Sequence, residues 1–164
     1  MRRSRRLPRR RGSEGKAASD MARQQLGWYV RNCAMSSAAG MLEAAVQVES
    51  GRHVVGLIAY DVQYPGPLGA LRPIGAIFAA ALVLSPAPSD AAFAAIEVTL
   101  QARDAPPSPL AIPDLESLRR STPAARSLPL LAALARREDC HLCVDYLENL
   151  ALTFGITMLA DKPA

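Results

Sequence analysis

The chain has 164 residues, half of them hydrophobic, which is enough for one domain with its own core. Its formal net charge of +4 is uneven, because residues 1–16 hold seven Arg and one Lys against a single Glu. Three cysteines and no secretory signal argue against a disulfide-stabilised secreted protein. The longest apolar run, Ile74–Leu84, is about half of the roughly 20 residues that a membrane-spanning helix needs. These features predict a soluble, cytoplasmic protein.

Residues 1–32 are expected to form a basic arm in front of the domain. The first residues are too charged and too poor in apolar side chains to fold alone, which predicts disorder. An arginine cluster of this kind could bind the phosphates of a nucleic acid. We expect an inert arm instead, because the rest of the chain is mildly acidic and has no recognition-helix pattern or interleaved aromatic residues. The folded domain is then expected to span residues 33–160.

The first predicted elements of the domain are a helix and a strand. From Met35 onward, apolar residues recur at three- and four-residue spacing, which predicts an amphipathic helix through Val46 and beyond. Gly51 follows the periodic stretch and is expected to take the left-handed conformation that ends a helix. Val54–Tyr60 is a continuous apolar run, which favours a strand buried on both faces.

A proline-rich stretch separates this strand from a second apolar run. Pro65, Pro67 and Pro73 exclude a regular helix between them. Asp61–Gly75 is therefore expected to be an ordered surface loop over strand ends, a place where sites are often built. Ile77–Leu84 is long enough for a buried strand, although a short buried helix fits the same pattern.

The segment after Pro86 predicts a mixture of short elements. Asp90 can cap a short turn of helix that runs through Ala95. Ile96–Gln101 then alternates apolar with polar residues, as a half-exposed strand does. After a proline-rich connection, Asp114 can cap a short helix that ends at Arg120.

The C-terminal part predicts one helix and two strands. Ser127–Arg137 has a capping Ser, a Pro in the first turn and two arginines at the end, which together are typical of a helix. The apolar stretches on either side of Glu148 and Asn149 predict two strands. In the first of these strands, alternation places four residues toward the core: Cys140, Leu142, Val144 and Tyr146.

Few residues offer chemistry of their own. Cys140 and Cys143 form a CxxC motif with His141 between them, but residues three apart in a strand point to opposite faces, so the two thiolates could not share one metal ion. We expect structural cysteines and no metal. His53 is expected to be a solvated turn residue, and Asp61, directly after the strand, is expected to cap the loop that follows it.

Cys33 is the candidate catalytic residue, since it precedes the first predicted helix. The unpaired amides and the dipole at a helix N-terminus can lower the pKa of a thiol and make it a nucleophile. The alternative is a small buried residue without reactivity.

The helix and strand resemble part of the thiolase-like condensing enzymes. The closer resemblance is to the β-ketoacyl synthase-like N-terminal domain, as found in chain-length-factor-like proteins of aryl-polyene-type gene clusters. It is carried by Gly40–Val48 (GMLEAAVQV), by Leu57–Pro86 (LIAYDVQYPGPLGALRPIGAIFAAALVLSP) and, more weakly, by Pro123–Arg136 (PAARSLPLLAALAR). The pattern YD..YP.PL..LRPI is its specific part, and the resemblance extends over residues 34–160 or so.

The resemblance implies an α/β fold with a mixed sheet packed with helices, one part of a thiolase-like half. In such enzymes the reactive Cys would fall near Ala34, one residue from Cys33, and neither His53 nor His141 lies in a matching motif. The early strands and the later half with its catalytic histidines are expected to be missing. The exposed sheet edges that this leaves would favour pairing with another chain.

These implications lead to one leading expectation about function. We expect a non-catalytic, chain-length-factor-like component of fatty-acid or polyene (polyketide-type) biosynthesis, with a ketosynthase subunit and an acyl carrier protein as partners and no cofactor. Two alternatives stay open. One is an acyl-accepting thiol enzyme that uses Cys33, and the other is nucleic-acid binding through the arginine-rich arm.

Overall fold

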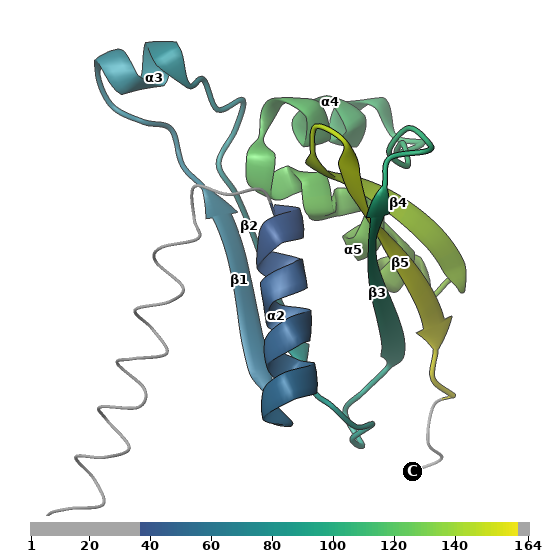
Figure 1. Ribbon diagram of the computed structural model, residues 1–164. Coiled ribbons are helices and arrows are strands. Elements are labelled where there is room, and N and C mark those ends of the chain that lie inside the picture. Colours follow the sequence, from purple (N-terminus) through teal and green to yellow (C-terminus); the bar gives the residue numbers. More distant parts are fainter. Residues whose placement is uncertain (1–36, 161–164) are drawn as a thin grey trace, which may run out of the picture. The chain divides into compact units, whose positions relative to one another are not determined.

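The computed structural model describes residues 37–160, which belong to one compact unit of the chain (Figure 1). In chain order, its elements are α2 (Ser37–Gly51), β1 (Val55–Asp61), α3 (Pro67–Leu71), β2 (Phe78–Leu84), β3 (Ala94–Ala102), α4 (Pro113–Ser121), the 3-10 helix η1 (Pro123–Ser127), α5 (Leu128–Arg136), β4 (Cys140–Leu147) and β5 (Leu150–Met158).

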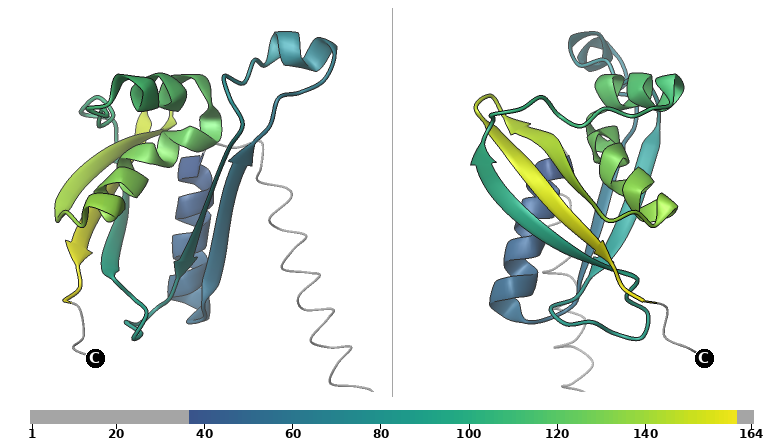
Figure 2. Two further views of the ribbon diagram at one scale, coloured as in Figure 1. Left: turned by 180° about the vertical axis from the view of Figure 1, so that it is seen from behind. Right: turned by 90° about the vertical axis from the view of Figure 1, so that its right-hand side faces the viewer.

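The strands form two sheets, and every pairing within residues 37–160 is antiparallel. β1 pairs with β2, while β5 is the central strand of a second sheet in the order β3-β5-β4 (Figure 2, right). The predicted α/β class is confirmed, but the single mixed sheet is wrong. A parallel pair needs a crossover of a dozen or more residues. The connection between β4 and β5 is too short for one. The longer connections between β1 and β2 and between β3 and β5 allow either direction, and both pairs are antiparallel.

The hydrophobic core lies between α2, α5 and one face of each sheet. Its buried members come from four elements: Ala38, Met41, Leu130, Ala133, Leu134, Val144, Leu152, Phe154 and Ile156. Side chains of β1, β2 and β3 pack against them, among them Leu57, Leu82 and Val98. Each large aliphatic side chain that is fully buried contributes roughly 1.5–3 kcal/mol. The core therefore ties the two sheets together through the helices.

The predicted first helix is confirmed as α2, but its end differs by one residue. Gly51 is the last helical residue, and Arg52, with φ 52°, takes the left-handed conformation predicted for Gly51. The Arg52 N–H donates to the carbonyl of Val48 at 3.0 Å, and its guanidinium pairs with Glu49 at 3.1 Å. These contacts offset part of the cost of about 1–2 kcal/mol for a non-glycine residue in this region.

β1 is a half-exposed strand, so the prediction of burial on both faces is wrong for this chain. Leu57 and Ala59 lie toward α2, whereas Ile58 is 58% and Tyr60 is 43% exposed. The apolar run is continuous, but within the described residues α2 covers only one side of it. We call the other side of the β1–β2 sheet the outer face (Figure 2, left); it is formed by Gly56, Ile58, Tyr60, Ala79, Ala81 and Val83.

The structure shows the conformation of Ile77–Leu84, predicted as a strand or a short helix, and of the Asp61–Gly75 connection, predicted as a loop. Ile77–Leu84 is a strand rather than a helix, because β2 spans Phe78–Leu84 and pairs with β1 along its length. The Asp61–Gly75 connection is mostly loop, but it contains the short helix α3. Pro67 lies in the first turn of α3, where a missing N–H costs no helical hydrogen bond.

Three predicted helix starts differ in detail from the structure. No helix follows Asp90, since β3 begins at Ala94. α4 begins at Pro113 with Ile112 as its N-cap, so Asp114 lies inside the first turn and does not cap the helix. Ser127 is the N-cap of α5 but makes no capping hydrogen bond, because its hydroxyl donates to the carbonyl of Ala124 at 2.8 Å within the preceding 3-10 turn.

The predicted C-terminal strands are confirmed as β4 and β5, joined at Glu148 and Asn149. The four β4 residues expected to face the core pack against it: Cys140, Leu142, Val144 and Tyr146. Among residues 37–160, no helix combines the length and apolar character required to cross a bilayer.

Candidate functional site

Asp61 ends β1 inside the YD..YP.PL..LRPI pattern and is almost fully buried, at 6% exposure. Its Oδ2 accepts a hydrogen bond from the N–H of Ala124 at 2.5 Å. Ala124 lies in the first turn of η1, where backbone N–H groups have no partner within the helix. Asp61 therefore caps η1, far along the chain, rather than the loop that follows it as we expected.

A second set of contacts joins the start of β2 to the turn between α4 and η1. The N–H of Gly75 donates to the carbonyl of Ser121 at 3.0 Å, and the N–H of Ala76 donates to Thr122 Oγ1 at 3.3 Å. Thr122 is 1% exposed. A side chain at Gly75 would overlap the Ser121 hydroxyl, so glycine permits this close approach. The ends of β1 and β2 are thus held to the same short stretch of chain.

A small cavity lies beside this junction, between α2, the β1–β2 sheet and α5. Its volume is about 30 Å³ and its walls are mostly apolar, with Met41, Leu82 and Phe154 among them. Ser37 also lines the cavity, and its buried Oγ has no hydrogen-bond partner in the part of the chain that is described. This volume has room for two or three water molecules at roughly 10–15 Å³ each. The cavity is therefore too small for a long acyl chain.

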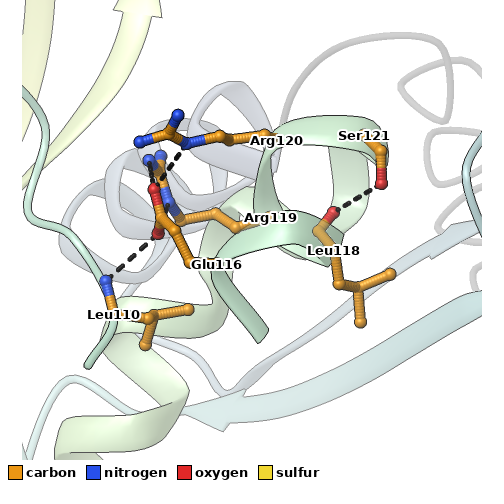
Figure 3. Close-up of polar contacts among 6 residues, drawn as sticks. All are labelled: Leu110, Glu116, Leu118, Arg119, Arg120 and Ser121. Atoms are coloured by element: carbon orange, nitrogen blue, oxygen red, sulfur yellow. Dashed lines mark hydrogen bonds and ion pairs between the residues drawn. The ribbon is translucent and has the colours of Figure 1, made fainter. Parts of the chain in front are cut away.

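A cluster of four hydrogen bonds surrounds Glu116 on α4 (Figure 3). Arg119 donates to both carboxylate oxygens at 2.7 Å, and Arg120 donates to Oε1 at 2.7 Å. The N–H of Leu110 adds a fourth bond at 3.1 Å. The side chains of Glu116 and Arg119 are only 14% and 10% exposed. This cluster fastens the connection before α4 to the helix, and its two arginines hold the pKa of Glu116 well below its ordinary value.

The lowered pKa of Glu116 predicts a pH dependence of stability. The stability that the ionised carboxylate contributes is fully present above its ordinary pKa of 4.5 and is lost as the pH falls toward the lowered value, because the unfolded chain binds the proton first. Glu116→Gln should therefore flatten the loss of stability below pH 4.5, measured by urea unfolding at several pH values. The exposed Glu43 offers the control, since Glu43→Gln should keep the wild-type slope. Equal slopes for wild type and Glu116→Gln would contradict this prediction.

The two cysteines of the CxxC motif lie on opposite faces of β4, as expected. Cys140 packs against the core opposite Ile156, whereas Cys143 pairs with Thr153 on the other face. Burial, and to a lesser extent the nearby Asp145, raise the pKa of Cys143. A raised pKa keeps the thiol protonated and poorly nucleophilic. Among residues 37–160, which include both cysteines, no group of three or more His, Cys, Asp or Glu side chains could hold a metal ion.

The two histidines considered from the sequence, His53 and His141, do not lie in a shared polar site. His53 is exposed, with Nδ1 2.9 Å from the carbonyl oxygen of Gly51, in agreement with a solvated turn residue. His141 is exposed on β4, on the face that also carries Cys143. Cys33 and the arm of residues 1–32 lie outside the described residues, as does the predicted start of the domain at residue 33.

Sequence reasoning missed the Glu116 cluster and the role of Thr122. The spacing of Glu116, Arg119 and Arg120 carried a usable signal, because acid and base three and four residues apart on a helix are neighbours. Thr122 carried none, since its partner Ala76 is distant in the chain. Among the described residues, three of the buried polar side chains thus have structural roles: Asp61, Arg119 and Thr122.

Comparison of this chain with protein-family models, with curated proteins and with solved structures found no match.

Proposed function

We propose that this chain is a non-catalytic, ketosynthase-like component of cytoplasmic fatty-acid or polyene biosynthesis, where it pairs with a true ketosynthase and contacts an acyl carrier protein. The resemblance of Leu57–Pro86 to chain-length-factor-like proteins supports the pathway. The structural observation that carries the proposal is the β1–β2 sheet, whose strands include Tyr60 and Asp61 of the specific pattern.

The sheet supports a pairing role because it is small and open at both edges. Within residues 37–160, β1 pairs with β2 alone, so the outer edge of each strand presents backbone N–H and C=O groups. A two-stranded sheet is marginal by itself, and open edges accept a strand from another chain through main-chain hydrogen bonds. A ketosynthase subunit could extend this sheet in that way.

The polar residues support a non-catalytic role. Asp61 is engaged at the N-terminus of η1, and the raised pKa of Cys143 disfavours a thiolate. His53 and His141 are exposed on separate elements. Condensation needs a nucleophile, a base and oxyanion donors held together. The described residues offer no such assembly, so the proposed contribution is made through binding.

The test is co-expression with the ketosynthase encoded nearest to this chain, followed by size-exclusion chromatography with light scattering. We expect a complex that contains both chains, because a ketosynthase strand added to an edge of the β1–β2 sheet holds them together. A ketosynthase from an unrelated system serves as the control and should elute separately. A well-folded chain that ignores its neighbouring ketosynthase would refute the proposal.

Cys33→Ala separates this proposal from the acyl-accepting alternative. After incubation with an acyl-loaded carrier protein, intact mass should show no covalent adduct on the wild-type chain, and the variant should bind the ketosynthase as well as wild type does. An adduct that appears on wild type and disappears in Cys33→Ala would establish acyl transfer to this thiol and overturn the non-catalytic role.

A further inference from the structure

The outer face of the β1–β2 sheet is entirely apolar apart from the Tyr60 hydroxyl. Val83 is 79%, Ile58 is 58% and Tyr60 is 43% exposed, and the other three members are Gly56, Ala79 and Ala81. None of the six is charged. The exposed face of the other sheet differs, because it carries Glu97, Thr99 and His141 among its outward residues. An apolar exposed face is therefore specific to the β1–β2 sheet.

Large and small residues alternate across the outer face in a regular way. The register places Gly56 opposite Val83, Ile58 opposite Ala81 and Tyr60 opposite Ala79. Each cross-strand pair thus combines one large side chain with one small residue. The large member lies on β1 in two pairs and on β2 in the third.

This arrangement is self-complementary. Consider a two-fold axis that runs parallel to the strands, above the outer face and midway between β1 and β2. It places β1 of one copy over β2 of the other, with paired residues at the same height along the strands. Ile58 then meets Ala81 of the second copy, Tyr60 meets Ala79, and Val83 meets Gly56. Every large side chain faces a small residue, so two sheets can approach to the usual spacing of about 10 Å without overlap or voids.

We propose that the outer face binds a second copy of this chain, forming a two-fold homodimer in which the two β1–β2 sheets pack face to face. A two-fold interface uses the same patch on both subunits and must match itself, as this one does. A stable interface buries roughly 800 Å² per partner. Three exposed apolar side chains at the ends of the two strands can add to the area of the outer face, since Val54, Val62 and Ile77 are 63%, 49% and 74% exposed.

This interface goes beyond the proposed function and is independent of it. It uses the face of the sheet, whereas strand addition by a ketosynthase uses the edges. The two contacts can coexist, and either can be lost without the other. Dimerisation of the isolated chain therefore reports on the face alone.

The first test is sedimentation velocity of the full-length chain over a wide range of concentrations. We expect a dimer that dissociates on dilution, and Ala81→Arg should raise its dissociation constant at least about tenfold, because a charge would be buried against Ile58 of the second copy. Val46→Arg is the matched control. Val46 is 54% exposed on α2, away from the outer face, so this variant should dimerise like wild type. Circular dichroism and thermal unfolding check that each variant is folded.

A swap of large and small residues tests the complementarity itself. Ala81→Ile should weaken the dimer, since it sets Ile against Ile58 of the second copy. Ile58→Ala should also weaken it by leaving a gap. The double variant Ile58→Ala/Ala81→Ile should restore dimerisation, because it exchanges the positions of the large and small residues and keeps the match.

Three outcomes would overturn the proposal. The first is a chain that stays monomeric at every concentration. The second is a dimer that Ala81→Arg leaves unchanged. The third is a stronger dimer in Ala81→Ile than in wild type, which is what a face that associates only through its total apolar area would give.

Discussion

Replacing Leu152 by alanine should lower the free energy of unfolding by about 3 kcal/mol, within the range of 2–5 kcal/mol for buried leucines. Leu152 is 0% exposed and lies in β5, the central strand of the three-stranded sheet. It pairs with Leu100 on one side and with Val144 on the other. The surrounding side chains are fixed by both neighbouring strands and cannot collapse into the space that the truncation leaves. Urea unfolding followed by circular dichroism measures the change.

Leu100 provides a matched control for this experiment. It carries the same side chain in the same row of the sheet but is 43% exposed. Leu100→Ala removes less buried surface and leaves no enclosed gap, so it should cost less than about half as much as Leu152→Ala. Similar losses at the two positions would contradict the placement of the core between the helices and this sheet.

Local sequence patterns predicted the parts of the fold that depend on neighbours along the chain. The three- and four-residue spacing from Ala38 to Val46 was sufficient for α2, because a helix repeats every 3.6 residues. The alternation from Cys140 to Tyr146 was sufficient for the core face of β4. In β4 the alternation also gave the buried side, whereas in α2 it did so only in part, because Val46 is 54% exposed and the polar Ser37 is buried.

Long-range contacts could not be predicted in the same way. The bond between Asp61 and Ala124 joins residues 63 positions apart, and the bond between Ala76 and Thr122 spans 46. No local pattern marks either pair. The sequence therefore indicated that Asp61 was a cap but assigned it to the loop that follows, whereas Asp61 caps η1. The separation of the strands into two sheets depended on contacts of the same kind.

The prediction that β1 is buried on both faces failed for a physical reason, and this reason bears on the proposed homodimer. A continuous apolar run is typical of a strand covered on both faces, and the run through Ile58 and Tyr60 has this character. α2 covers one face of it within the described residues, and the second face is exposed. The composition of the strand fits a protein in which another subunit completes the burial. The proposed face-to-face dimer would supply that second layer.

Asp61→Ala should lower the free energy of unfolding by about 2 kcal/mol. The carboxylate is buried, and its removal leaves the Ala124 N–H without its acceptor inside the protein, which costs about 1–3 kcal/mol for a neutral group. It also detaches the end of β1 from η1, so the edge proposed to receive a ketosynthase strand becomes less ordered. Urea unfolding measures the first effect, and co-purification with the ketosynthase measures the second.

Asp61→Asn separates the hydrogen bond from the charge at this position. The amide keeps an oxygen that can accept from Ala124, and an uncharged cap of this type is nearly as effective as a carboxylate at a helix N-terminus. We therefore expect Asp61→Asn to lose no more than about 1 kcal/mol and to retain ketosynthase binding. If Asn and Ala were equally destabilising, the negative charge rather than the hydrogen bond to Ala124 would be what holds β1 to η1. If neither were destabilising, the junction would contribute nothing to the fold.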